Sequence, residues 1–256
     1  MPLTIDLTQK TALITGATGQ LGRVMVRTFA TCGANVAIHY MHNRKQAEAL
    51  LDDVRRLGVD GCVVQADVGV ETDVQRMKAD IAQHLALPDI VVTNAVSQIF
   101  PWQSVLDEEI EDYHNQFKSC VMQNVLAARA FVPHMIENRW GRFIGINTEV
   151  SIQTLETQSA YAAGKKGMDG VLRVLSREVG PHAVTVNQVA PGWTLTHKSK
   201  NKILEAQQEY AQKLPMRRCG EAQEIANVVA FLASDLASYV NGTFIPVNGG
   251  NTFVGI

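Results

Sequence analysis

Short apolar runs alternate with amphipathic segments from one end of the chain to the other. The apolar runs predict buried strands at 11–15, 35–40, 62–66, 90–94, 142–147, 184–189 and 243–247. Apolar positions at helical spacing predict helices at 21–32, 44–57, 72–86, 108–138, 159–180 and 222–234. This alternation predicts an α/β fold, a Rossmann-like, doubly wound, seven-stranded parallel sheet with helices on both faces.

The chain is predicted to form a single domain, residues 1–256, because no linker, internal repeat or low-complexity tract divides it. Residues 194–215 fit the alternating pattern least, since polar side chains dominate them. Two interpretations stay open for this segment, a lid over a substrate site and a plain solvated helix. The lid is favoured because the segment follows Pro191-Gly192.

A glycine-rich turn joins the first predicted strand to the first predicted helix. Its glycines let the backbone approach a pyrophosphate, and the amides and dipole of the following helix face the same anion. An ordinary glycine-rich turn is the alternative, but the strand before it and the helix after it favour dinucleotide binding. The predicted cofactor-binding residues of this turn are Gly16, Thr18, Gly19, Gln20, Leu21 and Gly22.

Tyr161 and Lys165 are the most informative polar pair in the chain. They lie four residues apart in a predicted helix, so both side chains share one face, one turn apart. A tyrosine has an ordinary pKa near ~10, and a nearby positive charge favours the phenolate and lowers that pKa. The pair therefore predicts a proton donor and acceptor for a carbonyl and its alcohol.

These motifs, taken in order, resemble the short-chain dehydrogenase/reductase family over essentially the whole chain. The further motifs are Asp67-Val68, Asn94-Ala95, Thr148 thirteen residues before Tyr161, Asn187, Pro191-Gly192 with Thr196, and Val247-Asn248-Gly249-Gly250. Each motif is weak alone, and the ordered set is strong. The set is most similar to the 3-oxoacyl-acyl-carrier-protein reductases and their relatives that act on sugars and small carbonyls.

The resemblance implies a role for each matching residue. Tyr161 would exchange a proton with the substrate oxygen, Lys165 would lower the pKa of Tyr161 and hold the nicotinamide ribose, and Thr148 would donate to the reacting oxygen. Asp67 would bind the adenine amine, and Asn94 would help to position the ribose. The other cofactor-binding residues implied are Val68, Ala95, Val96, Pro191, Gly192, Thr194 and Thr196. As single residues, the Asn, Asp and Pro-Gly positions are also ordinary turn formers.

Four positions depart from the family pattern, and three of them border the cofactor or the substrate. Gln20 stands where the family has a glycine, which Gly19 supplies one residue earlier. Val96 adds bulk beside the cofactor, and Thr148 replaces the usual serine. A threonine keeps the hydroxyl but is stiffer at χ1, so it should restrict bulky substrates without abolishing the role.

Cys120 is the fourth departure and a candidate member of the catalytic site. It falls where the family has an asparagine that completes a proton relay behind the lysine. A thiol is only a weak hydrogen-bond partner, so the relay is predicted to be impaired or to use a neighbouring side chain. The candidate neighbours are Gln116, Ser119 and Asn124.

The choice between NADP and NAD is read at the end of the second predicted strand. An acidic residue there binds the adenosine ribose and repels a 2′-phosphate, whereas this chain has Tyr40. His42, Asn43, Arg44 and Lys45 follow and could meet a phosphate, although Arg44 and Lys45 could equally lie on the exposed face of the next helix. NADP is therefore favoured over NAD.

Composition narrows the setting of this activity. The formal charge of −2 gives no electrostatic reason to expect nucleic acid or a membrane as a partner. Four widely spaced cysteines predict no metal site or disulfide framework and fit a reducing, cytoplasmic location. No apolar run reaches the ~20 residues that a membrane span needs.

The function expected from these features is NADP(H)-dependent interconversion of a carbonyl and a secondary alcohol on a small-molecule substrate. Two alternatives stay open, an NAD-dependent sugar or polyol dehydrogenase and a diverged nucleotide-binding protein with little turnover. Aromatic and apolar residues border the expected pocket, at Phe100, Trp102, Trp193 and Leu195. The resemblance also implies a homotetramer, in which helices 108–138 and 159–180 pack between subunits.

Overall fold

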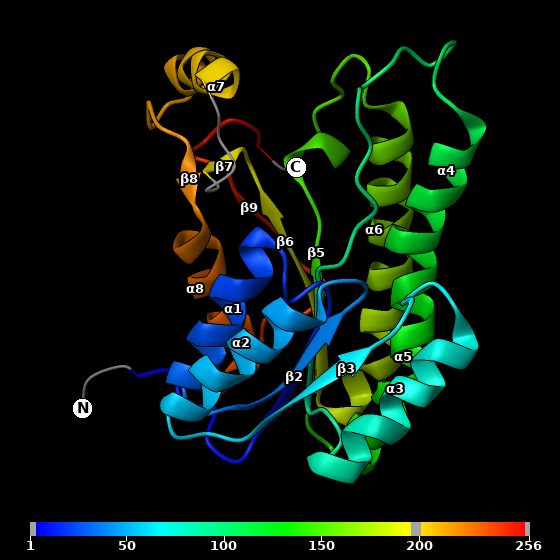
Figure 1. Cartoon of the computed structure of the whole chain (residues 1–256), viewed down its shortest axis with the longest axis vertical. Helices are drawn as coiled ribbons and strands as arrows, with labels where there is room; N and C mark the ends of the chain where they lie inside the picture. Colours follow the sequence, from blue (N-terminus) through cyan, green and yellow to red (C-terminus); the bar gives the residue numbers. More distant parts are fainter. Residues whose placement is uncertain (1–3, 196–200, 254–256) are drawn as a thin grey trace.

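A sheet of parallel strands forms the centre of the molecule (Figure 1). The computed structural model describes residues 4–195 and 201–253. Its strands are β1 (Thr11–Ile14), β2 (Asn35–Tyr40), β3 (Gly61–Gln65), β4 (Ile90–Thr93), β5 (Gly141–Ile146), β6 (Val184–Pro191) and β9 (Phe244–Val247). They pair in the order β3-β2-β1-β4-β5-β6-β9, and every pairing is parallel. The predicted fold class is confirmed.

Helices cover both faces of this sheet (Figure 1). On one face lie α1 (Gln20–Thr31), α2 (Arg44–Arg56) and α8 (Ala222–Ala233). On the other lie α3 (Glu71–His84), α4 (Ile110–Gln116), α5 (Gln123–Glu137) and α6 (Ser159–Val179). The order of strands reverses between β1 and β4, and in doubly wound sheets ligands bind beside the carboxyl ends of strands at such a point.

Each face of the sheet has its own apolar core. On the first face, Met25 and Phe29 of α1 are fully buried against the strands and against Ile225 of α8. On the second face, Met77 of α3 and Phe131 of α5 are buried together with residues of β1 and β4. The sheet is therefore covered on both sides, which is why its strands read as continuous apolar runs rather than alternating ones.

The region predicted as one helix at 108–138 differs from that prediction. It comprises α4, a π-helical segment at Phe117–Met122 (the π segment) and α5. The π segment packs against α6, where added Cβ atoms at Gly164 and Gly167 would meet Gln116 and Val121 within 3 Å. The helix therefore changes from α to π winding where it approaches the glycines of α6 closely. The spacing of apolar residues in the sequence predicts a helix here but does not reveal this change of winding.

The polar segment 194–215 contains a helix of its own. Thr194–Leu195 form β7, which pairs in parallel with β8 (Gly220–Glu221), and Asn201–Lys213 form α7. Figure 1 shows α7 beyond the carboxyl ends of β6 and β9. Within residues 4–195 and 201–253, no helix combines the length and the apolar character required to cross a membrane.

Candidate active site

The glycine turn leaves the first turn of α1 open to an anion. Gly16 adopts a φ of 60°, a conformation that glycine takes readily, and an added Cβ there would lie 2.9 Å from the Cα of Ala95. Gly19 precedes α1 and offers no side chain to cap it, and the first turn of α1 contains no acidic residue. The helix amides and dipole are therefore free for a negative group, and this turn fits the pyrophosphate of a dinucleotide.

His39 of β2 holds this turn in place. Its buried ring accepts a hydrogen bond at Nδ1 from the Gly16 amide at 2.9 Å, and Nε2 donates to the carbonyl of Ala66, also at 2.9 Å. Burial lowers the pKa of His39 to about 4, so the ring stays neutral at physiological pH. The sequence interpretation missed His39, although a single histidine inside an apolar strand was a usable signal.

Asn94 connects the fourth strand to the glycine turn. Its side-chain amide donates to the carbonyls of Thr15 at 2.9 Å and Gly16 at 3.2 Å. The hydroxyl of Thr15 in turn accepts from the backbone amides of Asn94 and Ala95 at 2.8 and 3.0 Å, and donates to Gln123 at 2.6 Å. The expected tie between these strands is thus present, and Gln123 of α5 is an additional support that sequence reasoning did not identify.

Asp67, predicted to bind adenine, already makes contacts within the protein. Its Oδ1 accepts from the Gly69 amide at 2.9 Å, and its Oδ2 accepts from Lys118 of the π segment at 2.8 Å. Val68 beside it is buried. A carboxylate has four acceptor sites, so these two contacts orient Asp67 and still leave acceptor capacity for a ligand.

The residues predicted to discriminate NADP from NAD lie where β2 meets α2. Tyr40 is buried at the end of β2, whereas His42 and Arg44 are exposed. Asn43 caps α2 by accepting from the Gln46 amide at 3.0 Å, and Arg44 pairs with Glu48 at 2.8 Å.

A cation that the sequence reasoning overlooked lies beside this group. Arg23 of α1 donates to Gln20 at 2.6 Å. When the amide of Gln46 is oriented to donate to the Thr18 carbonyl, its oxygen accepts from Arg23 at 3.0 Å. The first turns of α1 and α2 are therefore joined around a guanidinium.

Tyr161 and Lys165 come together on α6 as predicted. The Lys165 ammonium lies 5.9 Å from the centre of the Tyr161 ring and is almost completely buried, with 3% of the residue exposed. It donates to the carbonyl of Ile146, the last residue of β5, at 2.6 Å. On its other side, the Tyr161 ring contacts Trp102 at a centroid distance of 5.8 Å. The pair thus lies between the end of β5 and an aromatic wall.

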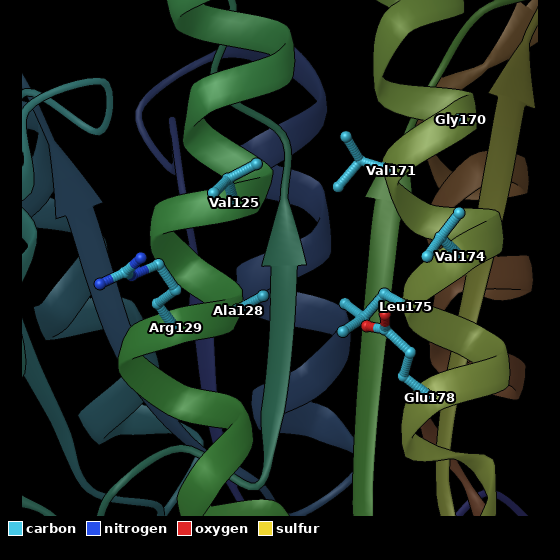
Figure 2. A pocket seen from close by; sticks show the side chains of 8 residues that line it. All are labelled: Val125, Ala128, Arg129, Gly170, Val171, Val174, Leu175 and Glu178. Carbon is cyan, nitrogen blue, oxygen red and sulfur yellow. The ribbon is translucent and has the colours of Figure 1, made fainter.

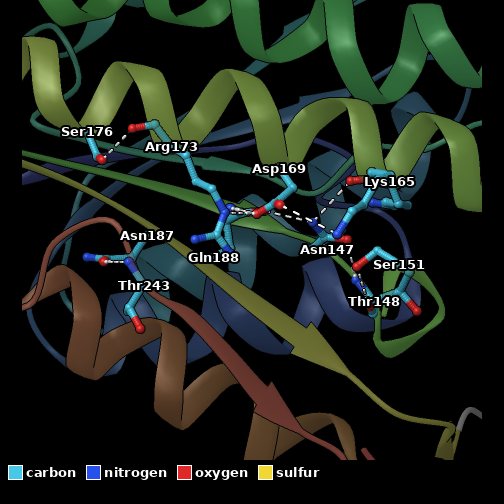
Figure 3. Close-up of polar contacts among 11 residues, drawn as sticks. Asn147, Thr148, Ser151, Lys165, Asp169, Arg173, Ser176, Asn187, Gln188 and Thr243 are labelled. Atoms are coloured by element: carbon cyan, nitrogen blue, oxygen red, sulfur yellow. Dashed lines mark hydrogen bonds and ion pairs between the residues drawn. The ribbon is translucent and has the colours of Figure 1, made fainter. Parts of the chain in front are cut away.

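A buried polar network stands behind this pair (Figure 3). Asn147 donates to the Lys165 carbonyl at 3.2 Å and to Gln188 of β6 at 2.7 Å, and it accepts from the Thr148 amide at 2.8 Å. Gln188 donates to Asp169 at 2.8 Å, which also accepts from Arg173 at 2.7 Å. Asn147 therefore fixes the backbone at both Thr148 and Lys165. The sequence did not indicate this role, because an asparagine after a strand is also an ordinary turn former.

Thr148 follows β5 and is buried next to this network. Its hydroxyl accepts from the Val150 amide at 3.3 Å and keeps its own proton available for donation.

Cys120 lies in the π segment with 1% of its surface exposed, and its thiol donates to Gln116 at 3.6 Å. The carbonyl of Cys120 accepts from the Asn124 amide at 2.6 Å, so Asn124, one of the predicted neighbours, approaches the relay position.

The expected nicotinamide segment follows β6. Pro191 ends that strand, and the Gly192 amide donates to the Val247 carbonyl of β9 at 3.1 Å. The Thr194 hydroxyl donates to the Gly192 carbonyl at 3.0 Å. Thr196, also predicted to bind cofactor, lies outside the described residues. Asn187 ties β6 to the loop before β9, since its amide donates to the Val240 carbonyl at 2.7 Å.

Comparisons with known proteins agree with this geometry. A model of the family described as enoyl-(acyl carrier protein) reductase matches residues 16–252. The 3-oxoacyl-[acyl-carrier-protein] reductase of Pseudomonas aeruginosa is 37% identical over 248 residues, which are 96% of this chain and 98% of that protein.

Two solved structures share the fold. A promiscuous reductase described as catalysing keto-reduction at C1 during lugdunomycin biosynthesis has a TM-score of 0.89 and 28% identity, and the match covers 96% of this chain and 99% of that one. A 3-oxoacyl-[acyl-carrier protein] reductase of Brucella melitensis with bound NAD has a TM-score of 0.89 and 25% identity, over 98% of this chain and 94% of that one. The chain therefore belongs to the short-chain dehydrogenase/reductase family and is an oxidoreductase that acts on CH–OH groups with NAD(P).

Proposed function

We propose that this protein is an NADP(H)-dependent reductase that interconverts a small carbonyl compound and its secondary alcohol. The observation that carries the proposal is the Tyr161–Lys165 pair on α6, held beside Thr148 by Asn147. These groups lie at the carboxyl edge of the sheet, as does the open turn at Gly16. A dinucleotide and a proton donor can thus meet at one edge of the sheet.

Each residue has a separate task in this proposal. The bound nicotinamide supplies or takes up the hydride. Tyr161 gives its phenolic proton to the substrate oxygen during reduction, and Lys165 favours the phenolate through its positive charge. Thr148 donates a hydrogen bond to the same oxygen and stabilises its developing charge. The remaining N–H groups of Lys165 would hold the nicotinamide ribose.

The preference for NADP rests on the charges near the end of β2. Tyr40 replaces the acidic residue that would repel a 2′-phosphate, Arg44 and Lys45 lie in the first turn of α2, and Arg23 contacts Gln46 of that turn. A guanidinium binds phosphate with charge-assisted hydrogen bonds. Arg44 would exchange its exposed contact with Glu48 for the ligand, because exposed ion pairs contribute little.

The substrate site is proposed to lie between Tyr161 and the segment 194–215. Trp102 and Phe100 form an apolar side of this site, and α7 would serve as its lid. Acyl thioesters, as in the relatives' names, and sugars or polyols are the two substrate classes considered. The four cysteines are free, which supports a reducing, cytoplasmic location.

A homotetramer is part of this proposal. An apolar hollow of about 460 Å³ lies between α5 and α6. Val171, Val174 and Leu175 line its α6 side (Figure 2). Val174 is 57% exposed and is part of the apolar lining that Val171 and Leu175 continue. Arg129 and Glu178 provide opposite charges at its rim. Packing against the same helices of another subunit would remove this apolar surface from water.

The Tyr161→Phe variant tests the function. The ring still packs against Trp102 but has no transferable proton, so folding and NADPH affinity should stay near wild type while turnover is largely lost. The assay is kcat/KM on a carbonyl panel, with NADPH affinity measured by fluorescence titration. Retention of more than about a tenth of kcat/KM, a loss below ~1.4 kcal/mol, would contradict the role of Tyr161. Nucleotide binding by the wild type without turnover of any substrate would instead favour a diverged nucleotide-binding protein.

A further inference from the structure

Glu149 is a buried carboxylate directly beside the proposed catalytic hydroxyl. It follows Thr148 and begins a 3₁₀ turn, Glu149–Ser151, with only 4% of its surface exposed. Its Oε1 accepts a hydrogen bond from the Tyr210 hydroxyl at 2.5 Å. Its Oε2 is enclosed and has no hydrogen-bond partner among the residues that the structure describes. A buried acceptor without a partner costs about 1–3 kcal/mol, so its presence calls for an explanation.

Tyr210 determines which oxygen of Glu149 is available. It comes from α7, and its burial, together with the hydrogen bond to Glu149, raises the pKa of its hydroxyl far above the ordinary value. The phenol therefore stays protonated and keeps Oε1 occupied. The same hydroxyl accepts from the Trp193 amide at 3.1 Å, and the two rings lie 5.5 Å apart. Oε2 of Glu149 is thus the oxygen that no donor occupies among the residues that the structure describes.

The contacts of Tyr210 connect Glu149, the residue after Thr148, with the segment that follows β6. Trp193 follows Pro191-Gly192, the segment proposed to hold the nicotinamide, so Glu149 and Tyr210 bridge that segment and the catalytic hydroxyl. An amide pair extends this polar side, because Asn251 donates to Gln153 at 3.1 Å and lies 3.4 Å from the Tyr210 hydroxyl.

The Tyr161 ring has an aromatic neighbour, Trp102, at a centroid distance of 5.8 Å. In this proposal the neighbours of the two catalytic groups favour different parts of a substrate, an apolar part at Trp102 and a hydrogen-bond donor at Glu149. A purely hydrocarbon substituent beside the carbonyl would leave Oε2 buried and unpaired.

We propose that Glu149 is a specificity-determining residue whose Oε2 accepts a hydrogen bond from a hydroxyl group next to the reacting carbonyl. The preferred substrates are then α-hydroxy carbonyl compounds and the corresponding diols. This proposal rests on the proposed function, since it assigns a substrate class to the same site. A site built to bind a hydroxyl discriminates strongly against the analogue that lacks it, because its own polar group is otherwise left unpaired.

The test compares hydroxyacetone with butanone, two ketones of similar size that differ by a hydroxyl in place of a methyl group. With NADPH, the wild type should favour hydroxyacetone by about tenfold or more in kcat/KM. In Glu149→Gln, the amide oxygen can still accept from Tyr210, but an NH₂ group replaces the charged acceptor. Its kcat/KM on hydroxyacetone should fall about fivefold or more relative to that on butanone, since charge-assisted bonds are the stronger ones.

Two further variants separate recognition from a structural role. Glu156→Gln changes an exposed carboxylate in the same loop and should keep the wild-type preference. Tyr210→Phe removes the donor to Oε1 but leaves Oε2, so it should also prefer hydroxyacetone. An unchanged preference in Glu149→Gln, or an equal loss on both ketones, would overturn the proposal. So would a Tyr210→Phe variant that loses the preference as fully as Glu149→Gln.

A binding measurement keeps this test independent of turnover. Propane-1,2-diol and butan-2-ol are titrated into the protein–NADP⁺ mixture, and their affinities are compared in the wild type and in Glu149→Gln. If the wild type binds the diol more tightly than butan-2-ol and Glu149→Gln does not, the role of Glu149 is supported. This result would hold even if the protein reduced neither ketone. In that event the proposed function would fail and the assignment of Glu149 would stand. Equal affinities for the two alcohols in the wild type would overturn the assignment of Glu149.

Discussion

Lys165 shows how a single residue serves both the fold and the site. Its ammonium is almost fully buried, where an unpaired charge would be costly, and its hydrogen bond to the Ile146 carbonyl offsets part of that cost. An ammonium has three N–H donors, so two remain for the ribose and for solvent or Tyr161. The charge is thereby held at a fixed distance from the Tyr161 ring.

Arg44→Ala should weaken NADPH binding more than NADH binding, because only NADPH carries a 2′-phosphate. A charge-assisted hydrogen bond contributes roughly 1.5–3 kcal/mol, so the Kd for NADPH should rise about ten- to a hundredfold. Fluorescence titration with both nucleotides measures the difference. Arg55→Ala, which removes an exposed cation in the last turn of α2, is the control and should leave both affinities unchanged. Equal changes in both affinities in Arg44→Ala would remove the main support for NADP.

His39 should make the stability of the protein depend on pH between about 4 and 6.5. Its folded pKa of about 4 lies below the unfolded value of 6.5. The unfolded chain therefore binds the proton more readily, and the contribution of His39 is complete above pH 6.5 and decreases as the pH falls toward 4. A difference of this size corresponds to roughly 3 kcal/mol in the free energy of unfolding.

Denaturant titrations at several pH values measure this dependence. His39→Gln offers an acceptor to the Gly16 amide and a donor to the Ala66 carbonyl but cannot titrate, so its stability should vary less over this range. His42→Gln, which replaces an exposed histidine, should follow the wild type. Parallel pH profiles for the wild type and His39→Gln would show that another group is responsible.

At the scale of the elements, the π segment is the feature that distinguishes this site. It places Lys118 on Asp67, Cys120 against Gln116, and Ser119 where its hydroxyl accepts from the Ser97 amide at 3.1 Å. A π-helical turn leaves backbone groups with altered partners and occurs frequently at functional sites. The segment therefore connects Asp67, the proposed adenine ligand, with Cys120 at the proposed proton relay.

Cys120→Asn tests this relay. An amide both donates and accepts, so the folded variant should have a kcat equal to or higher than that of the wild type, with the largest gain where proton transfer limits the rate. Cys120→Ser is the size-matched control and should change kcat less. Steady-state kinetics with a solvent isotope comparison measures both. A correctly folded Cys120→Asn protein whose kcat is about tenfold lower would show that the site is built around the thiol, a difference of ~1.4 kcal/mol.

At the scale of the whole molecule, the hollow between α5 and α6 predicts assembly. Val174→Asp would place a charge in this apolar groove, so tetramers should give way to smaller species. Analytical ultracentrifugation at several concentrations measures the change. Leu57→Asp alters an exposed leucine at the end of α2 and should leave the assembly intact. A wild type that sediments only as a monomer would refute the proposed tetramer.

Local features of the sequence were sufficient for the fold and for much of the site. The order of strands and helices was readable because a short apolar run and a 3.6-residue period are each a property of one element alone. The Tyr161–Lys165 pair needed only the spacing of one helical turn. The confirmed family follows from such motifs in order. The π segment was missed because it depends on how closely α6 approaches, not on a local period.

Contacts between residues far apart in the chain were decided only by the tertiary structure. His39 supports Gly16 across 23 residues, Lys118 pairs with Asp67 across 51, and Tyr210 donates to Glu149 across 61. None of these partners can be found from spacing, because each depends on which strand ends and helices the fold brings together. The sequence by itself therefore determined the sheet, the glycine turn and the reacting pair. Packing decided how the turn is held and which donor Glu149, the carboxylate after Thr148, meets, since buried polar groups take whichever partner the packed elements provide.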